Sequence, residues 1–240
     1  MKNLKLKDKV AVITGASSGI GKAVTERFSL EGIKSIITAR RKKELNKLSQ
    51  NTGIMPVAGD ITDPDLPRKL LDSAIKQYGR CDIIVNNAGI LTSGKIEEID
   101  VERVTQMVKI NVEAAFRISY TFLKYFKAGN CGHLINISSV LGTKARPTTG
   151  AYAGTKYAIE ALSEALRLEL AGTNIRVSCI EPGLVMTELH NEWEVHPSKM
   201  FNISKPLQPE DIAEQIIFIL KQPEHIRIPR LMILPGEHSI

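Results

Sequence analysis

A tyrosine and a lysine four residues apart, Tyr152 and Lys156, have types and spacing that can support chemistry. Residues four apart lie on one helical face, so the ammonium group can lie beside the phenol. Free tyrosine titrates near pH ~10, and moving that pKa to neutrality takes roughly 4 kcal/mol, which a fixed positive neighbour helps to supply. The pair is therefore a candidate acid–base site. Tyr120 and Lys124 have the same spacing, so the pattern alone does not distinguish a reactive tyrosine from a surface one.

Composition restricts the class of protein. The 240 residues are 43% hydrophobic and 24% charged, which is typical of a globular protein. The net charge of +6 comes from basic residues spread along the chain without interleaved aromatic residues, which disfavours a nucleic-acid partner. No segment approaches the ~18 apolar residues of a membrane span, and residues 1–9 lack the apolar stretch of a signal peptide. Cys81, Cys131 and Cys179 lack metal-ligand spacing and are expected to be reduced thiols, so a cytoplasmic location is predicted.

A glycine-rich turn follows the first expected strand, residues 9–14. The turn reads Gly15-Ala16-Ser17-Ser18-Gly19-Ile20-Gly21, and a helical pattern continues from it to Gly32. A strand, a glycine turn and a helix together present backbone N–H groups to an anion, as in dinucleotide-binding proteins. The spacing differs from the commoner Gly-x-Gly-x-x-Gly, so a purely structural turn remains an alternative.

The second expected strand, residues 35–38, ends at Arg40 and Arg41. In a dinucleotide fold an acid at this position binds the ribose 2′-hydroxyl of NAD, whereas an arginine accommodates the 2′-phosphate of NADP. This chain has no acid there, so NADP is predicted in preference to NAD. The alternative is that these charges only begin the helix that runs through Leu45 and Leu48.

Apolar runs and helical patterns alternate along the chain. They predict an α/β fold, with one Rossmann-like domain over residues 1–240: a doubly wound parallel sheet of about seven strands with helices on both faces. Ligands bind at the carboxyl edge of such a sheet. The expected strands are 9–14, 35–38, 54–58, 81–85, 133–137, 175–180 and 230–234, and the longer helices are 66–78, 101–126, 151–170 and 209–220.

Two polar residues distinguish Tyr152 from Tyr120. Ser139 follows the fifth strand, thirteen positions before Tyr152, and Tyr120 has no such hydroxyl before it. Asn111 lies within the long helix 101–126, where an asparagine indicates a local distortion or a specific polar partner. An exposed asparagine without such a role is the alternative.

Residues 188–206 have weak periodicity and are expected to form a lid over a pocket. Trp193, the only tryptophan, is expected to cap an apolar substrate there. His190 and His196 form no recognised metal spacing and are interpreted as solvated loop histidines, so no metal site is predicted.

Six motifs in one order resemble the short-chain dehydrogenase/reductase family over residues 9 to about 187. They are Thr14-Gly15-x-x-x-Gly19-Ile20-Gly21, Asn86-Asn87-Ala88-Gly89, Asn111, Ser139, Tyr152-x-x-x-Lys156 and Pro182-Gly183-x-x-x-Thr187. The part from residue 208 to 232 is similar to the NADP-dependent branch that acts on small 3-hydroxy acids and related alcohols.

The resemblance implies roles for the catalytic set. Tyr152 would exchange a proton while hydride passes between the substrate and the nicotinamide. Ser139 would hydrogen-bond the substrate oxygen, and Lys156 would bind the nicotinamide ribose and lower the pKa of Tyr152. Asn111 would hold a water that leads from the lysine to solvent. The cofactor set implied is Gly15, Ser17, Ser18, Gly19, Ile20, Gly21, Arg40, Arg41, Asp60, Ile61, Asn87, Ala88, Gly89, Tyr152, Lys156, Pro182, Gly183, Val185 and Thr187.

The substrate side is less defined. The resemblance places a pocket wall between Ser139 and Tyr152, where Lys144 or Arg146 would pair with a carboxylate or would be solvated loop charges. The substrate set predicted is Ser139, Leu141, Arg146, Thr149 and Trp193.

The leading hypothesis is an NADP-dependent enzyme that interconverts a secondary alcohol or hydroxy acid and its ketone. The alternative from another class is a catalytically idle, cofactor-sensing protein on the same fold. A basic nucleic-acid-binding module ranks last. The resemblance also implies a homo-oligomer, a dimer or a homotetramer, built on the helices 101–126 and 151–170.

Overall fold

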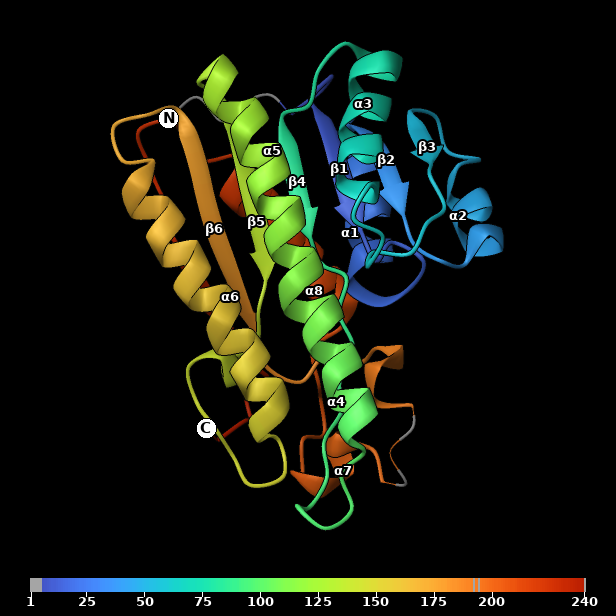
Figure 1. Ribbon diagram of the computed structural model, residues 1–240, viewed down its shortest axis with the longest axis vertical. Coiled ribbons are helices and arrows are strands. Elements are labelled where there is room, and N and C mark those ends of the chain that lie inside the picture. The colour runs from blue at the N-terminus through green and yellow to red at the C-terminus, as the bar shows by residue number, and fades with distance from the viewer. Residues whose placement is uncertain (1–5, 192, 194, 240) are drawn as a thin grey trace.

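The computed structural model describes residues 6–191, 193 and 195–239. Within them lies a sheet of seven parallel strands in the order β3-β2-β1-β4-β5-β6-β7 (Figure 1). The α/β fold and the parallel sheet predicted from the sequence are therefore confirmed. The strands are β1 Val10–Thr14, β2 Lys34–Thr38, β3 Ile54–Pro56, β4 Ile83–Asn86, β5 Gly132–Ile137, β6 Ile175–Pro182 and β7 Arg230–Ile233.

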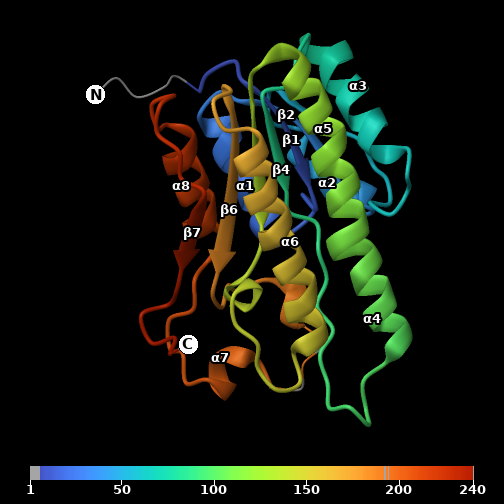
Figure 2. The ribbon, with the colours of Figure 1, turned by 60° about the vertical axis from the view of Figure 1, so that its left-hand side comes forward.

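Helices cover both faces of the sheet. Helices α3, α5 and α6 lie on one face, and α1 and α8 lie on the other (Figure 2). The helices are α1 Gly19–Leu30, α2 Lys42–Leu48, α3 Leu66–Tyr78, α4 Val101–Val108, α5 Ala115–Gly129, α6 Gly150–Glu169, α7 Pro197–Met200 and α8 Pro209–Leu220, with short helical segments η1 Lys109–Ala114, η2 Val140–Gly142 and η3 Glu188–His190.

The strands are apolar throughout because each contributes to two cores. Successive strand residues point to opposite faces, so Ile13 packs in the core that contains Phe28 of α1. Its neighbour Val12 packs in the core that contains Phe122 of α5. Every residue of β1 is buried, as expected for a parallel strand covered on both sides.

The long helix predicted over residues 101–126 is divided. Helix α4 passes into the π-helical segment η1, and α5 continues from it. Asn111 lies within η1, so the distortion predicted at this asparagine is confirmed. A π-turn re-aims the side chains of its residues, and such turns are frequent at functional sites.

All seven strands run the same way, so their carboxyl ends form one edge, at the bottom of the sheet in Figure 1. The segment predicted as a lid, residues 188–206, lies at this edge and contains η3 and α7; residues 192 and 194 are outside the described part. A search of the described residues finds no helix with the length and apolarity needed to cross a membrane.

Candidate active site

The glycine turn between β1 and α1 forms one wall of a cleft of about 760 Å³. Gly15 has a φ of 67° and Gly19 a φ of 50°, values that favour glycine. A Cβ on Gly21 would lie 2.4 Å from the Gly15 carbonyl oxygen, so the turn has no room for a side chain there. These glycines let the backbone turn tightly at the start of α1.

The start of α1 can receive an anion. The first backbone N–H groups of a helix have no partner inside it. The Ser18 side chain makes no capping hydrogen bond, and the first turn contains no acid. The turn therefore fits a pyrophosphate, because the start of α1 lines the cleft and its first turn carries no competing carboxylate.

Hydrogen bonds join the end of β4 to this turn. Thr14 Oγ1 accepts from the backbone N–H groups of Asn87 and Ala88, each at 3.0 Å. Asn87 Nδ2 donates to the Thr14 carbonyl at 2.9 Å. The Asn87 amide thus positions the turn, in addition to lining the cleft.

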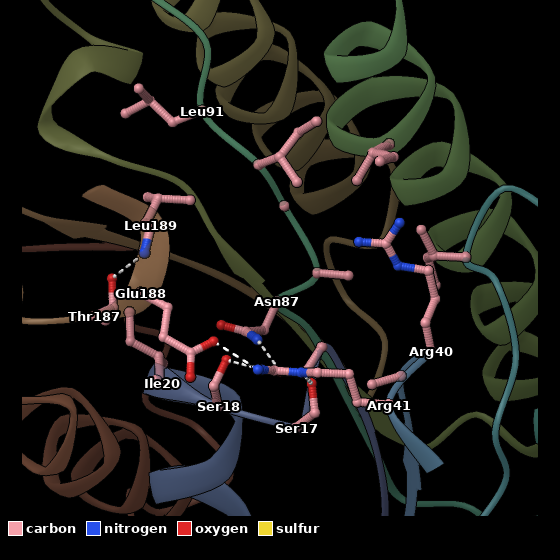
Figure 3. A pocket seen from close by; sticks show the side chains of 18 of the residues that line it. Ser17, Ser18, Ile20, Arg40, Arg41, Asn87, Leu91, Thr187, Glu188 and Leu189 are labelled. Atoms are coloured by element: carbon pink, nitrogen blue, oxygen red, sulfur yellow. Dashed lines mark hydrogen bonds and ion pairs between the residues drawn. The ribbon is translucent and has the colours of Figure 1, made fainter. Parts of the chain in front are cut away.

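The two arginines after β2 differ in their contacts. Arg40 lines the cleft, and within the described residues its side chain makes no hydrogen bond or ion pair, although its charge helps to lower the pKa of Asp60. Arg41 binds Ser17, Ser18 and Glu188 (Figure 3). Asp60 Oδ1 accepts from the backbone N–H of Thr62 at 2.9 Å and from its hydroxyl at 2.8 Å. These bonds, the backbone one first, lower the pKa of Asp60.

Asn111 is buried, and its carboxamide has three partners. Oδ1 accepts from the Ile90 N–H at 2.9 Å, and Nδ2 donates to the Ile90 carbonyl at 2.8 Å. Nδ2 also lies 3.2 Å from Thr155 Oγ1, whose hydroxyl donates to the Tyr152 carbonyl. The alternative of an exposed asparagine is therefore wrong, because η1 turns the amide toward the β4 loop and α6.

Ser139, Tyr152 and Lys156 meet at the edge of the sheet. The side chains of Tyr152 and Lys156 are buried. The lysine Nζ lies 5.7 Å from the centroid of the tyrosine ring and donates to the Ile137 carbonyl at 2.9 Å. Ser139 Oγ accepts from the Leu141 N–H at 3.1 Å. Tyr120, the other candidate, is 47% exposed on α5 and lies outside this cleft.

Burial controls the pKa values of this pair. It raises the pKa of Tyr152 to about 12, although a hydrogen bond with Ser139 acts in the opposite direction. Burial also lowers the pKa of Lys156 to about 8. For the tyrosine, desolvation of the phenolate outweighs the hydrogen bond with Ser139. The lowering of this pKa by Lys156 stays a prediction.

A smaller cavity of about 150 Å³ adjoins Tyr152 and is lined by all the predicted substrate residues. It is also lined by His190, Phe201 and His238, which sequence reasoning missed as pocket residues. His190 packs edge-on against Trp193, with ring centroids 5.7 Å apart, and burial lowers its pKa to about 4. The interpretation of His190 as a solvated loop histidine is therefore wrong.

Arg146 lies in the wall of this smaller cavity. Its guanidinium lies 5.2 Å from the Phe201 ring centroid and donates to the Ser239 carbonyl at 3.2 Å. His238 Nε2 lies 3.5 Å from it. The solvated alternative is therefore wrong for Arg146, whereas Lys144 is exposed.

The end of β6 and the residues after it are divided between the two cavities. Pro182, Gly183 and Val185, predicted to bind cofactor, line the smaller cavity, and Thr187 lines both. Most of the other predicted cofactor residues line the larger cleft: Gly15, Ser17, Ser18, Gly19, Ile20, Arg40, Arg41, Asp60, Ile61, Asn87, Ala88, Gly89, Tyr152 and Lys156. Across the described part of the chain, no group of three or more His, Cys, Asp or Glu side chains is placed to hold a metal ion.

Known proteins are similar to this chain in sequence or in fold. An uncharacterised oxidoreductase of Staphylococcus epidermidis is 34% identical over 96% of this chain and 99% of its own length. An uncharacterised oxidoreductase of Staphylococcus saprophyticus is also 34% identical, over 98% of this chain and 99% of its own.

Solved structures of two dehydrogenases or reductases have a similar fold. The closed form of a serine dehydrogenase complexed with NADP+ superposes with a TM-score of 0.90 at 29% identity, over 96% of each chain. A 3-ketoacyl-(acyl-carrier-protein) reductase from Brucella melitensis complexed with NADH has a TM-score of 0.87 at 28% identity, over 97% of this chain and 99% of its own. The family model of the short chain dehydrogenases matches residues 9–197. The chain belongs to the short chain dehydrogenase family and is an oxidoreductase of that family with a nicotinamide cofactor.

Proposed function

We propose that this protein interconverts a secondary alcohol or hydroxy acid and its ketone, with NADP(H) as the hydride carrier and Tyr152 as the acid–base residue. One observation carries the proposal. Tyr152 lines both the dinucleotide-sized cleft and the smaller cavity, which supports a role for its hydroxyl between a substrate and a nicotinamide.

Each residue of the catalytic set has a separate role in the reaction. When bound in the cleft, a nicotinamide would supply or accept the hydride. Ser139 holds the substrate oxygen, and Tyr152 O–H donates the proton to it during reduction. Because the pKa of Tyr152 is about 12, the phenol is protonated at neutral pH and ready to donate. Lys156, fixed by the Ile137 carbonyl, binds the nicotinamide ribose, and Asn111 holds the water that supplies the proton to this pair.

The preference for NADP rests on the rim of the cleft. The Arg40 side chain lines it without a hydrogen bond or ion pair among the described residues, and the segment that follows β2 begins with no acid. An arginine fork suits a phosphate dianion. We expect Arg40→Asp to weaken NADP+ binding and to favour NAD+, measured as two dissociation constants. A preference for NAD+ in the unmodified protein would contradict the assignment.

Arg146 supports a small carboxylate substrate. It is the arginine in the wall of a cavity of only about 150 Å³, and the structural neighbour with NADP+ is named for serine, a small hydroxy acid. Arg146→Ala should therefore raise the KM for hydroxy acids and leave that for neutral alcohols unchanged. Equal effects on both classes would refute the carboxylate contact.

One experiment tests the activity. A panel of alcohols, hydroxy acids and ketones is offered to the protein while the absorbance of NADPH is followed. Turnover of one class supports the enzyme, whereas tight NADPH binding without turnover of any compound would favour the cofactor-sensing alternative. We further propose that the protein works in the cytoplasm. We also propose that it is a dimer or tetramer, because α6 exposes the apolar surfaces of Tyr157 and Leu168, which are 45% and 58% exposed.

A further inference from the structure

Arg41 joins three segments that are far apart in the sequence. Its Nε donates to Ser17 Oγ at 3.1 Å and its Nη2 to Ser18 Oγ at 2.5 Å. Its Nη1 lies 2.8 Å from Glu188 Oε2, in the segment that follows β6 (Figure 3). All three guanidinium nitrogens are therefore engaged by the protein itself.

The fold does not require this ion pair. Arg41 is 46% exposed and Glu188 is 53% exposed. An ion pair this exposed stabilises a fold little, because water screens it. Glu188 also lines the cleft that begins at the N-terminus of α1, so its carboxylate is placed beside the proposed dinucleotide site.

Arg40, the neighbour of Arg41, is placed differently. It lines the same cleft, but no hydrogen bond or ion pair holds its side chain within the described residues. Figure 3 shows its side chain pointing away from the pair of Arg41 and Glu188. One arginine is therefore free to meet a phosphate at the end of β2, while the next is held on the glycine turn.

We propose that Glu188 determines cofactor specificity by competing with the 2′-phosphate of NADP for Arg41. The inference rests on the proposed NADP(H)-dependent function. Without the carboxylate, Nη1 of Arg41 is free to make a second charge-assisted contact beside that of Arg40. Because NAD lacks the 2′-phosphate, this competition acts on NADP alone.

The test measures binding, not turnover. Titration calorimetry gives dissociation constants of NADP+ and NAD+ for the unmodified protein and for Glu188→Gln, which keeps the shape and removes the charge. We expect NADP+ to bind about threefold tighter or more, and NAD+ to change by less than about twofold. Retained NAD+ binding also shows that the variant is folded.

The matched control is Glu214→Gln. Glu214 is 54% exposed and paired with Arg27, but it lies on α8 and outside the cleft. It should change neither constant. The gain from Glu188→Gln should disappear when Arg41 is alanine, because the gain requires the freed guanidinium.

Each other result overturns the inference. An equal tightening of both dinucleotides would indicate general repulsion by Glu188, and an unchanged or weaker affinity for NADP+ would show no competition. Failure of the unmodified protein to bind either dinucleotide would instead refute the proposed function on which the inference rests.

Discussion

Replacing Asn111 by alanine should destabilise the protein substantially. The carboxamide bonds both backbone groups of Ile90 and lies within reach of Thr155 Oγ1. Each buried polar group that loses its partner costs about 1–3 kcal/mol. Ile90 is only partly buried, so the cost for its backbone N–H and for its carbonyl is at the low end of this range. We expect the free energy of unfolding to fall by about 2–4 kcal/mol.

Urea unfolding at one fixed protein concentration measures this loss. The matched control is Asn46→Ala on α2, where the side chain is exposed and alanine has the better helix propensity. That variant should be as stable as the unmodified protein. A loss of less than about 0.5 kcal/mol in Asn111→Ala would show that η1 is not held in place by this amide.

Three further outcomes are expected. Gly21→Ala should weaken dinucleotide binding severely, because the new Cβ would lie 2.4 Å from the Gly15 carbonyl oxygen; unchanged affinity in calorimetry would contradict the tight turn. Lys156→Met should raise the melting temperature at pH 7, and the gain should shrink between pH 8 and 10.5. The reason is that folding lowers the pKa of Lys156 from 10.5 to about 8. Below pH 8 the buried ammonium therefore destabilises the folded protein. This cost decreases as the pH rises and vanishes above pH 10.5, where the lysine is deprotonated in the unfolded chain as well. A gain independent of pH would refute this. Leu168→Glu should reduce the oligomer seen by light scattering, whereas a monomeric unmodified protein would rule out the oligomer.

The sequence predicted the fold because its strands are buried on both faces. Strands of this kind appear as continuous apolar runs, and the turns after them carry the glycines and amides that form the cleft. The special position of Asn111 was also predictable, since an asparagine inside a helical pattern indicates a polar partner or a distortion, and the structure has both.

Other parts of the site depend on contacts that no local pattern encodes. His190, Phe201 and His238 come from the segment after β6 and from the C-terminal segment, and tertiary packing alone brings them to the smaller cavity. The ion pair of Arg41 and Glu188 joins residues 147 positions apart, counted from their numbers. The raised pKa of Tyr152 likewise arises from burial, which its sequence neighbours do not reveal.

Tyr152→Phe tests the central claim most directly. The change removes only the hydroxyl, so NADPH affinity should stay within about twofold of the unmodified protein, while kcat should fall by about 10²–10⁴-fold because the acid–base group is lost. Both quantities come from one preparation, by calorimetry and by NADPH absorbance. Turnover within tenfold of the unmodified enzyme, with intact NADPH binding, would contradict the role assigned to the phenol.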